Sequence, residues 1–115
     1  MSDIINLNYL KEISGGDTNF IKEMLELYIS TTATEAVIFN ELYANKDISG
    51  IGHLAHKMKA PIQMLGANDL YNTIKGIEES CKTGLNLELL PGNIEKVIQL
   101  VDESIIEVRE LIKGL

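Results

Sequence analysis

The stretch that decides the fold, residues 52–79, has the sequence GHLAHKMKAPIQMLGANDLYNTIKGIEE. Its apolar residues recur at steps of three and four, which is the spacing along one face of an α-helix. The pattern is interrupted at Gly66, a residue suited to the left-handed turn that often ends a helix. The sequence therefore predicts one helix from Asp47 to about Met64 and a second helix over residues 68–82.

The first of these helices has a well-defined apolar face. On a helical wheel for residues 47–65, the apolar side chains fall within one arc of roughly 100°. His56 lies about 150° from the centre of that arc, so we expect its imidazole to point away from the core. Lys59 lies near the border of the arc, one turn after His56 and within reach of it. The residues of the arc are Ile48, Ile51, Leu54, Ala55, Met58, Ile62 and Leu65.

The outer face around His56 carries little bulk and no acidic residue. No Asp or Glu occurs between Ile48 and Ala67, although the formal charge of the chain is −7. A lightly positive face with a nucleophilic imidazole suits an incoming phosphoryl group or an acidic partner. The residues that we expect to line this docking surface are Gly52, His53, Ala60, Gln63 and Met64.

The chain before this stretch is also patterned as helices. Apolar residues spaced by threes predict a short helix over residues 4–13, ended by the pair of glycines that follows it. Asp17 is then a good N-cap, because its carboxylate can accept from the free amides of the next turn. From Asp17 the helical pattern continues to about Ala44.

The chain after residue 82 contains one loop and one further helix. Residues 83–92 predict the loop, and Pro91 or Asn93 opens the last helix, whose apolar face is sustained to its end. Strand patterns are absent, and short connections between long helices imply antiparallel neighbours. We therefore expect an all-α fold, an antiparallel up-down-up-down four-helix bundle with a short N-terminal helix, as a single domain over residues 1–115.

Composition and charge exclude several classes of function. The 17 acidic and 10 basic side chains give an acidic chain that repels nucleic acid and anionic membrane surfaces. The single cysteine, Cys81, excludes an internal disulfide. We find no apolar run long enough to insert into a membrane and no secretion signal, so we expect a cytoplasmic protein.

Residues 52–81 resemble the histidine-containing phosphotransfer (HPt) domain family. Gly15-Gly16-Asp17 is also similar to the N-terminal pattern of that family, and the helix count agrees, so the resemblance covers most of the chain. The segments that carry it are His56-Lys57-Met58-Lys59-Ala60-Pro61, then Leu65-Gly66-Ala67-Asn68-Asp69-Leu70, then Ile77-Glu78 and Cys81.

The resemblance implies a phosphorelay intermediate of two-component signalling. His56 would accept a phosphoryl group from an aspartyl phosphate on a receiver domain and pass it to another receiver. Lys59 would interact with the phosphoryl group. The protein would be a monomeric phosphocarrier and not itself an enzyme. It would hold no cofactor or metal, because the partner receiver supplies the Mg²⁺ and most of the catalytic groups.

The partner implied by the resemblance is the receiver domain of a response regulator or of a hybrid histidine kinase. Two residues depart from the family pattern. Ala60 stands where the family usually has glycine, which adds one methyl group to the approach face. Pro61 removes one helical hydrogen bond and clashes with the carbonyl of Lys57, which predicts a kink after His56.

Two alternatives remain at this point. The first is a docking module that binds a receiver or a kinase without accepting phosphate, as the departures at Ala60 and Pro61 suggest. The second is a metal site that uses His53 and His56. Two ligands from one helix need one or two more, and we place Cys81 on the buried stripe of another helix, so we expect no metal. We interpret Glu78, Glu79 and the acidic residues of the last helix as solvated.

Overall fold

The computed structural model describes residues 4–115, and this part of the chain is helical and contains no strand. The all-α class predicted from the sequence is therefore confirmed, and the first three residues of the predicted domain lie outside the described range. Among the helices described, none is both long and apolar enough to cross a bilayer. The elements are α1 (Asn8–Ser14), α2 (Thr18–Ala44), α3 (Ile48–Met64), α4 (Asn68–Thr83), the 3₁₀ turn η1 (Leu87–Leu89) and α5 (Leu90–Lys113).

Aspartates fix the start of α2 and of α3, as the sequence predicts. The carboxylate of Asp17 accepts from the amides of Asn19 and Phe20 at 3.0 and 3.3 Å. The carboxylate of Asp47 accepts from the amide of Gly50 at 2.9 Å. Each cap satisfies amide groups that have no partner within the helix, which is why these helices begin where they do.

The N-terminal helix begins at Asn8, so the prediction of a helix over residues 4–13 is wrong at its start. Residues 4–7 form an irregular segment, here called the N-terminal strap. Glu107 of α5 accepts from the amides of Ile4 and Ile5, and the amide of Asn6 donates to the carbonyl of Leu65 at 2.9 Å. These tertiary partners satisfy the amides of Ile4, Ile5 and Asn6 in place of the bonds of a first helical turn.

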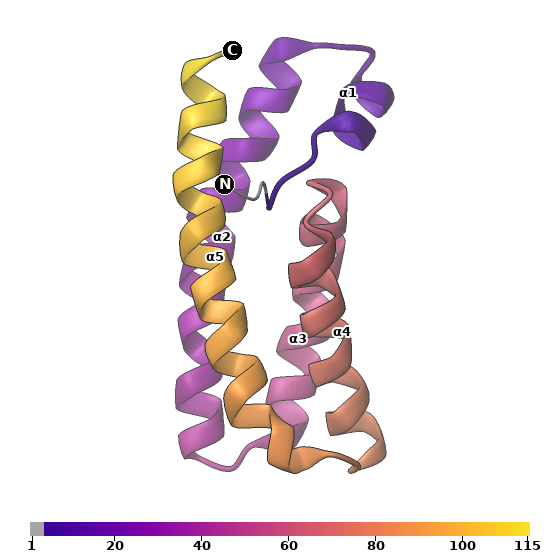
Figure 1. The fold of residues 1–115 in the computed structure, drawn as a ribbon, viewed down its shortest axis with the longest axis vertical. Helices are drawn as coiled ribbons and strands as arrows, with labels where there is room; N and C mark the ends of the chain where they lie inside the picture. The colour runs from indigo at the N-terminus through magenta and orange to yellow at the C-terminus, as the bar shows by residue number, and fades with distance from the viewer. Residues whose placement is uncertain (1–3) are drawn as a thin grey trace.

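The four long helices pack as two pairs, and the helices of one pair are longer than those of the other. α3 makes its largest contact with α4, and α2 makes its largest contact with α5. α2 and α5 have 27 and 24 residues, whereas α3 and α4 have 17 and 16. α2 and α5 therefore extend past the other pair, and α1 with the strap lies at that end of the molecule (Figure 1).

The core face of α3 is the one that the helical wheel predicts. Ile51, Ala55, Met58, Ile62 and Leu65 are buried, and Ile48 and Leu54 are half-buried. Gly66 has the predicted left-handed backbone with φ of 66°, and a Cβ at this position would collide with the carbonyl of Asn6. The turn between α3 and α4 thus depends on glycine both for its backbone angle and for the close approach of the strap.

Pro61 does not interrupt α3, which stays helical from Ile48 to Met64. The proline lies in the last turn, where its carbonyl still accepts from the amide of Leu65 at 3.3 Å. Because few helical bonds remain beyond this point, the missing amide removes little from the helix. Gln63 and Met64, which follow the proline, remain part of the helix.

Gly52, which we expect on the docking surface, is half-buried and faces Cys81 of α4. A Cβ built on Gly52 would lie 3.0 Å from the Cβ of Cys81. Its absence allows α3 and α4 to approach closely, which no wheel of α3 alone can show. On α4, Leu70, Ile74, Ile77 and Ser80 are buried. Cys81, which the sequence places on the buried stripe, is only half-buried.

Substituting Gly52 tests this close approach, with Gly76 of α4 as the matched control. A Cβ at Gly76 meets nothing within 4 Å. We expect Gly76→Ala to raise the free energy of unfolding by about 0.5–1 kcal/mol, through helix propensity alone. Gly52→Ala gains the same propensity but overpacks the interface, and should be less stable than Gly76→Ala by about 1–3 kcal/mol. Urea unfolding of both variants measures the difference, and equal stabilities would contradict the packing described here.

Candidate functional site

His56 is exposed on the outer face of α3, as predicted. Its side chain retains 72% of its accessible surface. The neighbouring Ala55 and Met58 are fully buried, so the backbone that carries His56 is anchored in the core. The imidazole is therefore presented to solvent from a rigid element.

Glu78 of α4 joins His56 and Lys59 into one cluster. Its Oε2 lies 2.5 Å from Nδ1 of His56, and its Oε1 lies 2.6 Å from Nζ of Lys59. The side chain of Glu78 is only 22% exposed. Our interpretation of Glu78 as a solvated residue is wrong, because the packing of α4 on α3 places its carboxylate between His56 and Lys59.

The state of Glu78 fixes the proton on the His56 ring. The hydrogen bond from Lys59 lowers the pKa of Glu78, and the contact with His56 lowers it further, so the carboxylate is ionised at neutral pH. An ionised carboxylate only accepts hydrogen bonds, and therefore Nδ1 of His56 carries the hydrogen. In the neutral ring the unprotonated nitrogen is then Nε2, whose lone pair is free to act as a nucleophile.

Lys59 is a cation held in place one turn from the imidazole. Glu78 raises the pKa of Lys59 through their hydrogen bond, so the ammonium stays charged. The side chain is 24% exposed. An ammonium has three N–H donors, so the contact with Glu78 leaves donors for an anion bound beside His56.

The outer face of α3 is not acid-free in the folded protein, contrary to the expectation from the sequence. Lys57 pairs with Glu35 of α2 at 3.0 Å, and Lys59 pairs with Glu78. Both carboxylates come from other helices and are invisible in the sequence of α3. The lysines of this stretch are therefore neutralised locally, and the positive character of the site is smaller than predicted.

The other predicted docking residues have different environments. His53, Ala60 and Gln63 are exposed, whereas Met64 is half-buried and packs against the core. Ala60, Gln63 and Met64 line a shallow hollow, which α1 and the strap complete from the other side. This contribution comes from a segment distant in sequence, so the pattern of residues 47–65 does not indicate it. The lining residues from the N-terminal segment are Asn6, Asn8 and Tyr9.

The residues considered for a metal site do not converge. Within residues 4–115, no group of three or more His, Cys, Asp or Glu side chains is placed to hold a metal ion. Cys81 lies against Gly52 in the α3–α4 interface. Burial raises the pKa of the Cys81 thiol, which keeps it protonated at neutral pH.

The ionisation of Glu78 makes a testable contribution to stability. Because its pKa is lower in the folded state than the usual 4.5, its stabilising effect is present above that pH. The effect is lost as the pH falls through the folded pKa, where the carboxylate is protonated. Glu78→Gln should therefore cost stability at pH 7 and progressively less below pH 4.5.

Urea unfolding of the Glu78→Gln protein across this pH range gives the comparison. Glu79→Gln removes a charge of the same sign from the exposed neighbour and controls for the overall change in charge. A loss of stability in Glu78→Gln that does not depend on pH, or that Glu79→Gln reproduces, would contradict the assigned role of Glu78.

Comparison of the chain with family models, with curated proteins and with solved structures returns no match. The geometry of the site is therefore what bears on the function of this chain. That geometry consists of an exposed imidazole on a rigid helix, a carboxylate on its Nδ1 and an ammonium on the same carboxylate.

Proposed function

We propose that this protein is a phosphorelay intermediate of the HPt type, in which His56 is reversibly phosphorylated on Nε2. One observation carries the proposal. The carboxylate of Glu78 holds Nδ1 of a solvent-exposed histidine, which leaves Nε2 as the nucleophilic atom. A histidine that only fills the core is buried, whereas the side chain of His56 keeps 72% of its accessible surface.

The transfer step balances without any further reactant. The lone pair of Nε2 attacks the phosphorus of an aspartyl phosphate on the partner, and a P–N bond forms. The P–O bond to the aspartate breaks, and the aspartate leaves as a carboxylate with that electron pair. The ring keeps its hydrogen on Nδ1 and becomes cationic, so the anionic Glu78 stabilises it.

Lys59 has a second role in this scheme. Phosphoryl transfer depends mainly on placement and on neutralisation of the oxygens of the transferred group. The ammonium of Lys59 lies on the same carboxylate as His56, and its free donors can meet those oxygens. The partner receiver is expected to bring the Mg²⁺ that neutralises the remaining charge.

The architecture is consistent with this function. We infer that α2, α3, α4 and α5 form an antiparallel up-down-up-down bundle, with α1 at one end. The connections at residues 45–47 and 65–67 are short, and each long helix packs on the next one along the chain. A monomeric cytosolic carrier of this kind presents its histidine on the side of the bundle, where a receiver can reach it.

A docking module that does not accept phosphate is the second candidate. It is favoured by the engagement of Lys59 with Glu78, because an ammonium already paired with a carboxylate attracts phosphoryl oxygens less strongly. The hollow beside Ala60, to which α1 contributes, gives such a module a surface for a receiver. The two candidates differ in whether a covalent adduct forms.

A transfer assay separates these candidates. Incubation with a panel of ³²P-labelled phosphorylated receivers should move label onto this protein as an adduct that is labile in acid and stable in alkali. His56→Gln should abolish the label. His53→Gln, which removes an exposed histidine one turn earlier on the same helix, should retain it. ¹⁵N NMR of the adduct should place phosphorus on Nε2.

Persistent labelling of the His56→Gln protein would overturn the proposal. Binding of a receiver without transfer, at equal affinity for the wild type and for His56→Gln, would favour the docking module. Labelling on Nδ1 would show that Glu78 does not hold the ring as described.

The Glu78 carboxylate should also affect the rate of transfer. A hydrogen bond to a charged group contributes about 1.5–3 kcal/mol, and each 1.36 kcal/mol in a barrier is about tenfold in rate. We therefore expect Glu78→Gln to slow the phosphorylation of His56 by about 10–100-fold. Glu79→Gln is the control, since this neighbouring carboxylate is exposed. Equal rates for the two variants would exclude a role for Glu78 in the reaction.

A further inference from the structure

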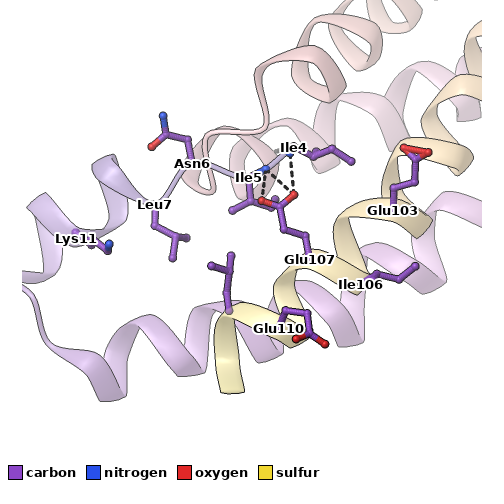
Figure 2. A pocket seen from close by; sticks show the side chains of 10 residues that line it. Ile4, Ile5, Asn6, Leu7, Lys11, Glu103, Ile106, Glu107 and Glu110 are labelled. Atoms are coloured by element: carbon purple, nitrogen blue, oxygen red, sulfur yellow. Dashed lines mark hydrogen bonds between the residues drawn. The ribbon is translucent and has the colours of Figure 1, made fainter. Parts of the chain in front are cut away.

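A groove lies between the N-terminal strap and the C-terminal part of α5 (Figure 2), away from the His56 cluster. Its volume is about 880 Å³, and none of its lining residues belongs to the cluster of His56, Lys59 and Glu78. Ile4, Ile5 and Leu7 of the strap line one wall. α5 forms the opposite wall.

The α5 wall is one continuous stripe of the helix. Its residues stand at positions i, i+3, i+4, i+7 and i+8, so they share one face. They span two turns, or about 12 Å along the axis. Ile106 within this stripe is 68% exposed, although it is a large apolar side chain. The members of the stripe are Glu103, Ile106, Glu107, Glu110 and Leu111.

The charge of the groove is strongly one-sided. Among residues 4–115, three glutamates line it against a single lysine, Lys11. Glu107 already accepts from the amides of Ile4 and Ile5, as Figure 2 shows, so its carboxylate holds the wall in place. Glu103 and Glu110 are exposed at the rim, where Glu110 also pairs with Lys113 at 3.2 Å. The nearby C-terminal end of α5 adds the negative end of the helix dipole.

We propose that this groove is a docking site for a cationic amphipathic helix of a protein partner. The apolar side chains of such a helix would cover Ile106 and the strap, and its lysines or arginines would meet Glu103 and Glu110. Charge complementarity selects this occupant, because anionic surfaces of membranes and nucleic acids would be repelled by the same carboxylates. The site is separate from the proposed phosphoryl site, so both can be occupied together.

The test uses the full ¹⁵N-labelled chain and a synthetic 18-residue helical peptide of leucine and lysine, with leucines at i, i+3, i+4 and i+7. The control peptide has glutamate in place of lysine. We expect the cationic peptide to shift the amide signals of residues 4–7 and 103–111, with an affinity that falls as salt is added. The glutamate peptide should bind at least tenfold more weakly.

Variants of the groove make the test specific to this site. Ile106→Ser should weaken binding roughly tenfold through lost apolar contact. Leu85→Ser, at a residue that is also exposed but lies in the loop after α4, should not. The double variant Glu103→Gln/Glu110→Gln should weaken binding severalfold, and Glu88→Gln/Glu95→Gln is its matched control. All four variants replace only exposed side chains, so we expect each of them to keep the fold.

Several outcomes would overturn the docking proposal. These are the absence of binding at millimolar peptide, signal shifts outside the groove, or equal losses in the groove variants and their controls. The last result would reduce the binding to general attraction between a basic peptide and an acidic protein. His56→Gln should leave the affinity unchanged, so this test is independent of the proposed phosphotransfer.

Discussion

The close packing of α3 on α4 is the constraint on which the candidate site depends. Gly52 has no side chain where α3 meets Cys81, and the two helices approach until a Cβ would come within 3.0 Å of its neighbour. This approach sets the rotation and height of α4 relative to α3. As a result, the carboxylate of Glu78 reaches both His56 and Lys59, which are one turn apart. Gly52 in the interface thus allows the carboxylate of Glu78 to reach the exposed imidazole of His56.

Charge in this protein is compensated between helices more than along them. Lys57 pairs with α2 and Lys59 pairs with α4, so the two cations beside His56 connect the neighbouring helices to α3. Exposed ion pairs contribute little to stability, but they hold side chains in defined places. For His56 the consequence is chemical, since an ionised Glu78 assigns the ring hydrogen to Nδ1 and leaves the nucleophilic lone pair on Nε2.

The N-terminal strap links parts of the molecule that are distant in sequence. Glu107 of α5 holds its first amides, and the carbonyl of Leu65 in the α3–α4 turn accepts from Asn6. The strap lies between two depressions, because Asn6 lines both the hollow beside Ala60 and the groove on α5. It therefore contributes to the surface near the candidate site as well as to the acidic groove.

The sequence by itself determined the helices, the caps at Asp17 and Asp47, the core face of α3 and the outward direction of His56. These features depend on the 3.6-residue period and on local hydrogen bonding, both of which are present in a single segment. The strap, the contact of Gly52 with Cys81, and the carboxylates of Glu35 and Glu78 beside the lysines were decided by the tertiary structure alone. Each of these depends on the rotation and approach of two separate helices or on a long-range partner for a backbone amide, and no periodicity within one segment contains that information.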